Sequence, residues 1–206
     1  MEELHALKAL QLDALREVAN IGAAHAATAL SQMIGGTIMI SVPTINVALL
    51  EDVPPQVAEP DEPVAAVLMH MMGDLTGRTL LVFPRRTALR LAELLLHRQT
   101  ESREFTEMEQ SAIKEAGNIL SSAYMNALSD FMGMMLLPSP PSLAVDMSNA
   151  VLTTAYLQFG SDGDLVFCVE SQFLMNKEVD TPLRGYFLLL PDPASLDAIL
   201  KAVRVG

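Results

Sequence analysis

The sequence is short of several residue types, and each shortage narrows what the protein can be. It has one cysteine, Cys168, which excludes an internal disulfide and fits a reducing compartment. It has no tryptophan and few other aromatic residues, so its hydrophobic half is mostly aliphatic, with 13 methionines as adaptable filler. Cys168 lies in the apolar stretch DLVFCVES, where we expect it to fill the core.

Basic residues are scarce as well. The chain has 13 Lys and Arg against 25 Asp and Glu, a formal net charge of −12. Such a surface repels phosphate backbones and anionic lipids, so neither nucleic acid nor a membrane surface is an expected partner.

Charged residues are missing altogether from one stretch, because residues 21–50 contain no Asp, Glu, Lys or Arg. The run is long enough to span a bilayer. It is interrupted by Gly35, Gly36 and Pro43 and by scattered polar residues, so we expect an Ala-rich helix followed by short strands. The first residues, MEELHALK, are acidic and lack a cleavable signal pattern. We therefore expect a soluble, cytoplasmic protein without membrane insertion.

What the chain does contain is an internal repeat. Residues 13–47 align without gaps on residues 111–145, a shift of 98 positions, with eleven identities among 35 positions. Conservative matches at Arg16/Lys114 and Leu15/Ile113 add to them. Self-similarity at this level indicates a duplication.

Each half reads as a long helix, an extended segment, further strands and a shorter helix that follows a proline. In the second half the strand prediction includes VLTTAYLQ, and the first half contains a polar surface loop at 51–63. The fold class predicted is α+β: an internally duplicated, pseudo-two-fold domain with a mainly antiparallel sheet flanked by helices. We expect one domain over residues 1–206, made of repeats at about 8–97 and 106–204. The two long helices are predicted to bury eight residues: Ile21, Ala24, Leu30, Ile34, Ile119, Tyr124, Leu128 and Phe131.

Each long helix carries a glutamate and an asparagine one turn apart, Glu17 with Asn20 and Glu115 with Asn118. This spacing places both side chains on one helical face. A solvated face would account for the glutamates, which favour helices. Asparagine is a poor residue inside a helix, because its amide competes for backbone hydrogen bonds. Its presence in both copies therefore indicates a site.

The chemistry open to this pair is limited. A carboxamide has an acceptor oxygen and two donor hydrogens, so it can hold a water while it donates to a phosphoryl oxygen. Phosphoryl hydrolysis needs that positioning together with neutralisation of charge. No cluster of Lys or Arg, Gly-rich phosphate loop or metal-ligand spacing lies near either pair, and the four histidines are scattered. We expect no cofactor bound by this chain and a protein substrate that brings its own metal and lysine.

Both copies also fit one longer pattern: Asp or Ser, three residues, Glu, two residues, Asn, twenty-two residues, Pro. The residues that meet it are Asp13, Glu17, Asn20 and Pro43, and again Ser111, Glu115, Asn118 and Pro141. With this pattern present twice, the chain resembles the CheC/CheX/FliY family of CheY phosphatases of bacterial chemotaxis over almost its whole length.

The resemblance implies a phosphatase that hydrolyses the aspartyl phosphate of a phosphorylated response regulator, CheY, which would itself carry the Mg²⁺. Asn20 and Asn118 would enter the active site of the regulator and orient the attacking water. Glu17 and Glu115 would help to hold the conserved lysine of the regulator. CheD, a receptor-modifying deamidase, is a further partner that the resemblance implies.

The other members of the pattern are expected to be structural. Asp13 and Ser111 would be polar groups at the start of a helix, and Pro43 and Pro141 would constrain the direction of the chain.

Two other classes of function stay open. The chain would be a non-catalytic adaptor if its helices only dock the regulator or CheD, and an adaptor would tolerate loss of the asparagines. A small-molecule sensor has no support beyond a large apolar core. In each case we expect a monomer, because the duplication supplies internally the two-fold contact that a single-copy relative would make as a dimer.

Overall fold

The computed structural model describes residues 9–49, 52–53, 57–59, 61–99, 105–159, 165–175 and 183–205. The first repeat holds α2 (Ala9–Ile34), β1 (Ile38–Ile40), β2 (Thr44–Leu49), β3 (Pro63–Gly73), β4 (Gly77–Pro84) and α4 (Arg85–Leu96). The second repeat holds α5 (Glu107–Met132), β5 (Leu136–Pro138), β6 (Ser142–Met147), α6 (Ser148–Phe159), β7 (Leu165–Met175), β8 (Leu183–Pro191) and α7 (Pro193–Val205). Each described element other than α6 has a described counterpart in the other repeat; the segment equivalent to α6, between β2 and β3, is described only in part.

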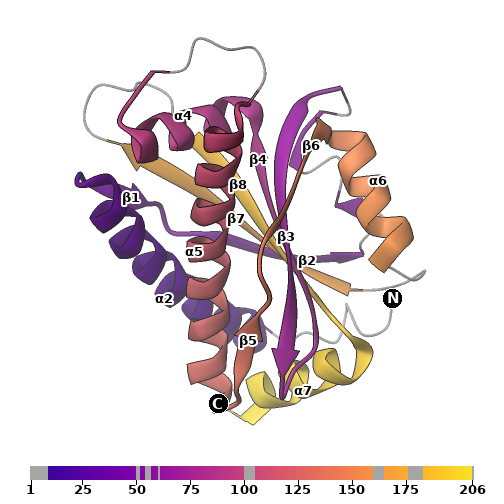
Figure 1. Ribbon diagram of the computed structural model, residues 1–206. Coiled ribbons are helices and arrows are strands. Elements are labelled where there is room, and N and C mark those ends of the chain that lie inside the picture. The colour runs from indigo at the N-terminus through magenta and orange to yellow at the C-terminus, as the bar shows by residue number, and fades with distance from the viewer. Residues whose placement is uncertain are drawn as a thin grey trace.

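The eight strands of the described residues form one sheet, in which every pairing is antiparallel (Figure 1). Its order is β1-β7-β8-β4-β3-β5, with β2 also on β7 and β6 also on β3. The first two strands of each repeat therefore pair with the other repeat. The registers are repeated as well, since Ile45 pairs with Val169 as its counterpart Leu143 pairs with Val67. The predicted duplicated α+β fold is confirmed; the exchange of strands was not predicted.

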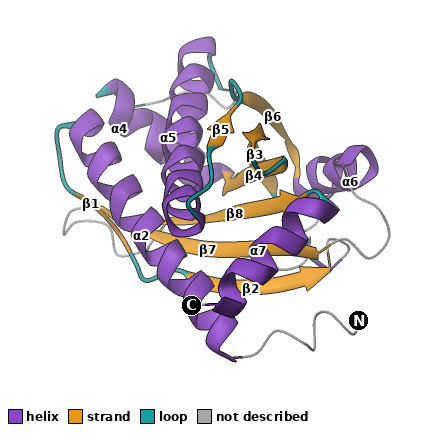
Figure 2. Cartoon of the chain, turned by 90° about the horizontal axis from the view of Figure 1, so that it is seen from below, coloured by secondary structure: helices purple, strands orange, loops and turns teal. Residues whose placement is uncertain are grey.

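Helices cover both faces of the sheet (Figure 2). α2, α4, α5 and α7 pack on one face, and α6 packs on the other. Because side chains alternate along a strand, Val67 and Leu81 enter the core beneath α2 and α5, whereas Ala66 and Val82 enter the core beneath α6. This two-sided burial explains why the central strands read as nearly continuous apolar runs.

α2 and α5 lie side by side and run antiparallel, as Figure 1 shows. Their contact is close at Gly22, where an added Cβ would lie 2.6 Å from a ring atom of Tyr124. Each helix has 26 residues and is followed by a glycine in the left-handed region, Gly35 at φ 64° and Gly133 at φ 63°. A positive φ at this position ends a helix at little steric cost only for glycine. Both copies thus turn from helix to edge strand in the same way.

The start of α5 corrects one prediction. Its N-cap is Thr106, which accepts a hydrogen bond from the Glu109 backbone amide while the Glu109 carboxylate accepts one from the Thr106 backbone amide. Ser111 is the fifth residue of α5 and Asp13 the fifth residue described in α2, so neither stands at a helix start. The capping box was readable in the sequence TEME and was missed.

The predicted helix burial was half right. Leu30, Ile34, Tyr124 and Leu128 are buried, whereas Ile21 is 39% and Phe131 40% exposed. Ala24 is also exposed and Ile119 half-buried. The error arose because both faces of these helices carry apolar residues, so the composition did not identify the inner face.

Two further assignments were wrong for a shared reason. Residues 148–159 form helix α6 rather than a strand, and it buries Val151 and Leu152 against the second face of the sheet. In the segment predicted as a polar surface loop, Val53 and Val57 are buried in the same core. Sequence reasoning allowed for only one covered face. Cys168 lies in this core too, which confirms it as core filling.

The run without acidic or basic residues, 21–50, forms the rest of α2 and then β1 and β2, as predicted for its described part. Among the helices that the structure describes, none combines the length and the apolar composition needed to cross a bilayer.

Candidate functional site

α2 presents Asp13, Glu17 and Asn20 along one stripe of its surface. Asp13 and Glu17 are exposed and Asn20 is half-buried. Steps of four and three residues keep the three side chains on one side of the helix. The opposite stripe, which includes Leu15 and Ala19, is buried in the core over the sheet. Asn20 therefore lies at the border between the packed and the solvated face, where the helix restrains its amide and solvent still reaches it.

α5 repeats this arrangement position by position. Ser111 and Glu115 are exposed, and Asn118 is half-buried, each like its counterpart in α2. The buried stripe here includes Ala116 and Gly117. The sequence thus predicted correctly that each Glu and Asn would share an accessible helical face.

The two pairs are displaced from each other along the paired helices. Each pair lies in the N-terminal half of its helix, and α2 and α5 are antiparallel (Figure 1). Glu17 and Asn20 are therefore separated from Glu115 and Asn118 along the length of the helix pair. The structure does not bring the two copies together; it leaves two equivalent candidate sites related by the internal two-fold.

The polar groups of the two sites are largely unengaged. In the described part of the chain, the side chains of Asn20 and Asn118 make no hydrogen bond, and Glu17 and Glu115 make no ion pair. Donors and acceptors without an internal partner are available to an incoming molecule.

The copies differ at the first position of the pattern. Asp13 pairs with Arg16 at 2.6 Å on the exposed surface of α2, whereas Ser111 carries no charge that could pair with Lys114. The ion pair was not predicted, although the Arg16/Lys114 match was visible in the repeat alignment. An exposed pair of this kind contributes little to stability. The ion pair instead changes the local surface: the first site carries a paired carboxylate and guanidinium, which the second site lacks.

Each of the two prolines lies in the short connection between two consecutive edge strands. Pro43 stands between β1 and β2, and Pro141 between β5 and β6. Both strands of each pair lie against the same neighbour, β7 or β3. A residue without an amide hydrogen fits this break in the ladder.

Neither site has the parts of a complete hydrolytic centre. Both stand on the convex surface of a helix, and the described residues contain no group of three or more His, Cys, Asp or Glu side chains that could hold a metal ion. A carboxamide and a carboxylate can orient a water and bind a cationic group, but they cannot neutralise a phosphoryl group. The chemistry of each site is complete only with a partner that supplies positive charge.

Fold and surface together define a class: an internally duplicated α+β protein that presents two equivalent faces, each with a Glu and an Asn, on its paired long helices. The family model described as the CheC-like family matches residues 10–47 and 108–145, which are the two copies of this helix and its edge strands. The chain is 30% identical to the CheY-P phosphatase CheC of Bacillus subtilis (strain 168), over 98% of each sequence. The chain belongs to the CheC-like family.

Solved structures agree on the fold. FliY of Thermotoga maritima is similar with a TM-score of 0.80 at 21% identity, covering 97% of this chain and 98% of that one. The middle domain of FliM from H. pylori is similar with a TM-score of 0.68 at 16% identity, covering 95% of this chain and 99% of that one. At these identities the likeness concerns the fold alone.

Proposed function

We propose that this protein is a phosphatase that hydrolyses the aspartyl phosphate of a phosphorylated chemotaxis response regulator of the CheY type. The observation that carries the proposal is the duplicated, accessible pair of Glu and Asn on α2 and α5. The CheC-like family and the relative named CheY-P phosphatase CheC support it. Hydrolysis of this phosphate ends or adapts the signal that the regulator transmits.

In the proposed mechanism the asparagine does the positioning. The regulator docks on the outer face of α2 or α5, so that Asn20 or Asn118 reaches its phosphorylated aspartate. The carboxamide oxygen accepts a hydrogen bond from a water, and the amide hydrogens donate to a phosphoryl oxygen. This holds the water in line with the bond that breaks, which is the main requirement of phosphoryl transfer.

The glutamate acts in docking. The carboxylate of Glu17 or Glu115 accepts a hydrogen bond from the ammonium group of a lysine of the regulator, and this contact fixes the distance between the asparagine and the phosphate. The positive charge that the transition state needs comes from that lysine and from the magnesium ion of the regulator, which is part of the substrate.

The alternative is an adaptor that binds the regulator without hydrolysis. The two differ in one measurement: the protein is mixed with a phosphorylated receiver domain, and release of inorganic phosphate is followed against the spontaneous rate. A phosphatase accelerates release catalytically, at substoichiometric concentration. An adaptor leaves the rate unchanged or slows it, and that result would overturn the proposal.

The same proposal places the protein in the cytoplasm, where the chemotaxis response regulator acts. It also makes the protein a monomer, since its duplication already supplies a two-fold contact; a stable dimer in light scattering at micromolar concentration would contradict this. CheD is a second partner, supported by the family resemblance. Its binding is to be measured by co-elution of the two purified proteins.

A further inference from the structure

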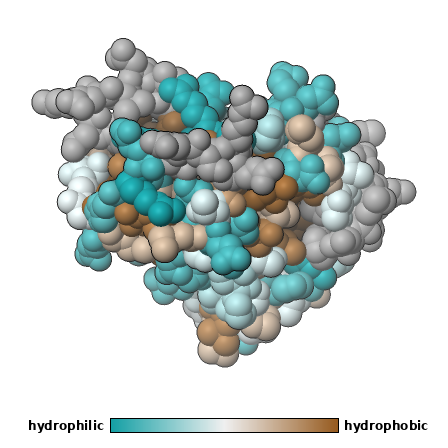
Figure 3. Space-filling model, turned by 45° about the horizontal axis from the view of Figure 1, so that its top comes forward, coloured by the Kyte–Doolittle hydropathy of each residue, from teal (hydrophilic) through white to brown (hydrophobic). Residues whose placement is uncertain are grey.

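Four arginines follow one another within a short stretch at the end of the first repeat, in a chain that is otherwise acidic. Of its nine arginines, four lie between residues 85 and 98. Three of these line an open pocket on α4, together with two leucines and one glutamate: Arg85, Arg86, Leu89, Arg90, Glu93 and Leu183. We call these six residues the arginine pocket. α4 lies at the top of the molecule in Figure 1, and Figure 3 turns this end toward the viewer, where hydrophilic and apolar residues adjoin.

Among the described lining residues, three arginines face a single carboxylate. Arg90 pairs with Glu93 at 3.1 Å, which engages the one carboxylate among the lining residues. Arg86 is exposed and makes no ion pair in the described part of the chain. Arg85 stacks on the ring of Phe105 at 5.4 Å, and its Nη2 atom is shielded from solvent without a hydrogen-bond partner. A shielded guanidinium nitrogen without a partner is costly, and an anion would satisfy it.

The position of these arginines within α4 adds to the imbalance. Arg85 and Arg86 are its first two residues, and its N-cap Pro84 makes no side-chain capping bond. The start of a helix carries a partial positive charge and free amide hydrogens, so cations are unfavourable there and anions are favoured. Two adjacent arginines at the N-terminus of α4 therefore destabilise the free protein. They stabilise a complex in which an anion binds there.

The second repeat provides an internal comparison. Its corresponding helix, α7, begins with Pro193 and Ala194 after Asp192. The first turn of α7 contains no acidic or basic residue, so the arginine cluster is not repeated there. There Ser195 accepts a hydrogen bond from the Thr76 amide instead. Each of these helices follows the last strand of its repeat and packs on the same face of the sheet, so the fold does not require arginine at this position.

We propose that the arginine pocket is a docking site for an acidic peptide segment of a partner protein. Arg86 and Arg90 are four residues apart and share one side of α4, a spacing that suits carboxylates on one strand or helical turn. The half-buried Leu89 and the buried Leu183 line the same pocket, so an aliphatic side chain of a peptide finds apolar contact there that a bare inorganic anion does not use. Nucleic acid is disfavoured by the net charge of −12.

The test uses the full chain and fluorescence anisotropy of a labelled peptide in which glutamates alternate with leucines. A matched peptide carries glutamine in place of glutamate. We expect saturable binding of the acidic peptide, weakened by added salt, and binding of the glutamine peptide weaker by about tenfold or more, because charge-assisted hydrogen bonds are lost. Equal binding of the two peptides would overturn the proposal.

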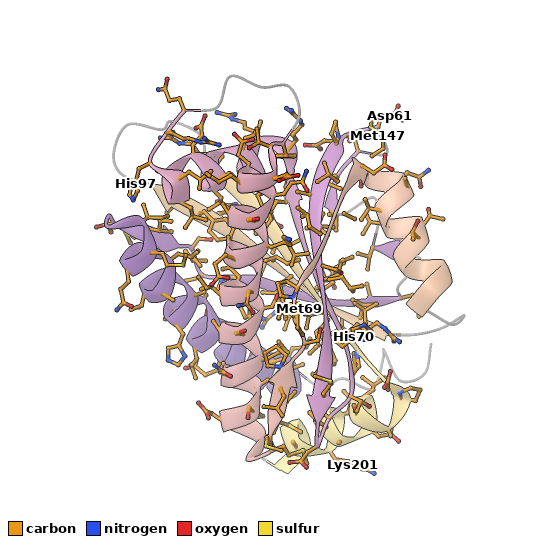
Figure 4. All side chains as sticks on the ribbon, in the orientation of Figure 1. Asp61, Met69, His70, His97, Met147 and Lys201 are labelled. Atoms are coloured by element: carbon orange, nitrogen blue, oxygen red, sulfur yellow. The ribbon has the colours of Figure 1, made fainter. Side chains whose placement is uncertain are left out.

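The variants locate the site. Arg86→Glu combined with Arg90→Ala should weaken binding of the acidic peptide at least about tenfold. Lys201→Ala is the control, since it removes a positive charge from the exposed face of α7 at the opposite end of the molecule (Figure 4). It should leave the affinity unchanged. Unaltered binding in the double variant, or an equal loss in the control, contradicts the assignment.

Two further readouts separate docking from other roles. Arg86→Ala should leave the thermal midpoint unchanged or raise it, because it removes a cation from a helix start; a marked drop would mean that Arg86 is structural. Inorganic phosphate is then added as a competitor at equal ionic strength. Displacement of the peptide by millimolar phosphate would show a simple anion site and overturn docking of a peptide.

Discussion

Leu81 of β4 pairs directly with Phe187 of β8, and each residue is the counterpart of the other in the internal repeat. The pair lies at the centre of a row that crosses the whole sheet and reads the same from either edge: Ile45, Val169, Phe187, Leu81, Val67, Leu143. The internal two-fold axis therefore passes between Leu81 and Phe187. Since each repeat also lends its first strands to the other, neither half has a complete sheet alone.

The packing beneath the two site helices breaks this symmetry. Gly117 lies directly on Val67, so that an added Cβ would be 2.7 Å from three of its side-chain atoms. Its counterpart Ala19 instead lines, with Val169, an apolar hollow of about 40 Å³ beneath α2. α5 is thus packed more closely on the sheet than α2. Asn118 follows Gly117 in the chain, so its position depends on this contact.

Gly117→Ala should therefore impair the second site alone. Overpacking against a β-branched side chain costs about 1–3 kcal/mol, partly offset by up to about 1 kcal/mol of helix propensity. We expect a net loss of stability on the order of 1 kcal/mol in chemical denaturation. Phosphate release should fall when Gly117→Ala is combined with Asn20→Ala, which leaves only the second site.

The matched control combines Gly117→Ala with Asn118→Ala, which leaves only the first site. Its phosphate release should equal that of Asn118→Ala alone, because α2 does not rest on Gly117. An equal decrease in both backgrounds would show that the substitution acts through general destabilisation instead.

Sequence reasoning recovered what the repeat encodes and missed what depends on long-range contacts. Because both copies carry the same pattern, the sequence predicts the duplication and the half-sheets. For the same reason it predicts the exposed helical faces that carry Glu17 and Glu115. The exchange of edge strands was not predicted, since pairing of Ile45 with Val169 joins segments far apart in sequence. α6 was missed because its apolar residues face a second core, which a half-sheet does not reveal.

Cys168 should make the stability of the protein sensitive to alkaline pH. Burial, with a smaller contribution from the charge of Glu170, raises the pKa of its thiol to about 12. The folded state thus keeps the proton at pH values where the unfolded chain loses it. Stability is fully present below the unfolded pKa of about 9 and falls as the pH rises toward 12. Between pH 8 and pH 10 we expect a loss of about 1 kcal/mol in the free energy of unfolding.

Cys168→Ala should flatten this dependence. The variant leaves a small cavity and is less stable at neutral pH, yet its free energy of unfolding should change less between pH 8 and pH 10. Burial also raises the pKa of Tyr124 and that of Tyr186. Any loss of stability from these tyrosines above pH 10 affects the original protein and Cys168→Ala alike. Urea titrations at the two pH values measure this change. If the free energy of unfolding falls by the same amount in Cys168→Ala as in the original protein, the thiol does not have this role.

Magnesium should belong to the substrate. The described residues offer no cluster of metal ligands, and the proposed mechanism takes its cation from the regulator. Calorimetric titration of magnesium into the protein alone should give no binding in the micromolar range. Phosphate release from a phosphorylated receiver domain should nevertheless stop when the ion is chelated. Tight binding of magnesium to this chain alone would mean that the site has its own metal.

The asparagines provide the decisive test of mechanism. Asn20 and Asn118 stand on separate helices, so the two sites should act independently. Asn20→Ala and Asn118→Ala should each leave roughly half of the phosphate release, or unequal shares if the sites differ. The double variant should lose about a hundredfold or more, as expected when the group that positions a reactant is removed.

The same variants should separate positioning from docking. Alanine is the better helix former, so folding should be unaffected or improved by about 0.5 kcal/mol per site. Binding of the phosphorylated regulator should persist in the double asparagine variant, because Glu17 and Glu115 and the surrounding helix surface are intact. Glu17→Gln with Glu115→Gln should instead weaken that binding, since the pairing with a lysine is lost. A folded double asparagine variant that still hydrolyses the regulator at the original rate would show that these carboxamides do not position the water.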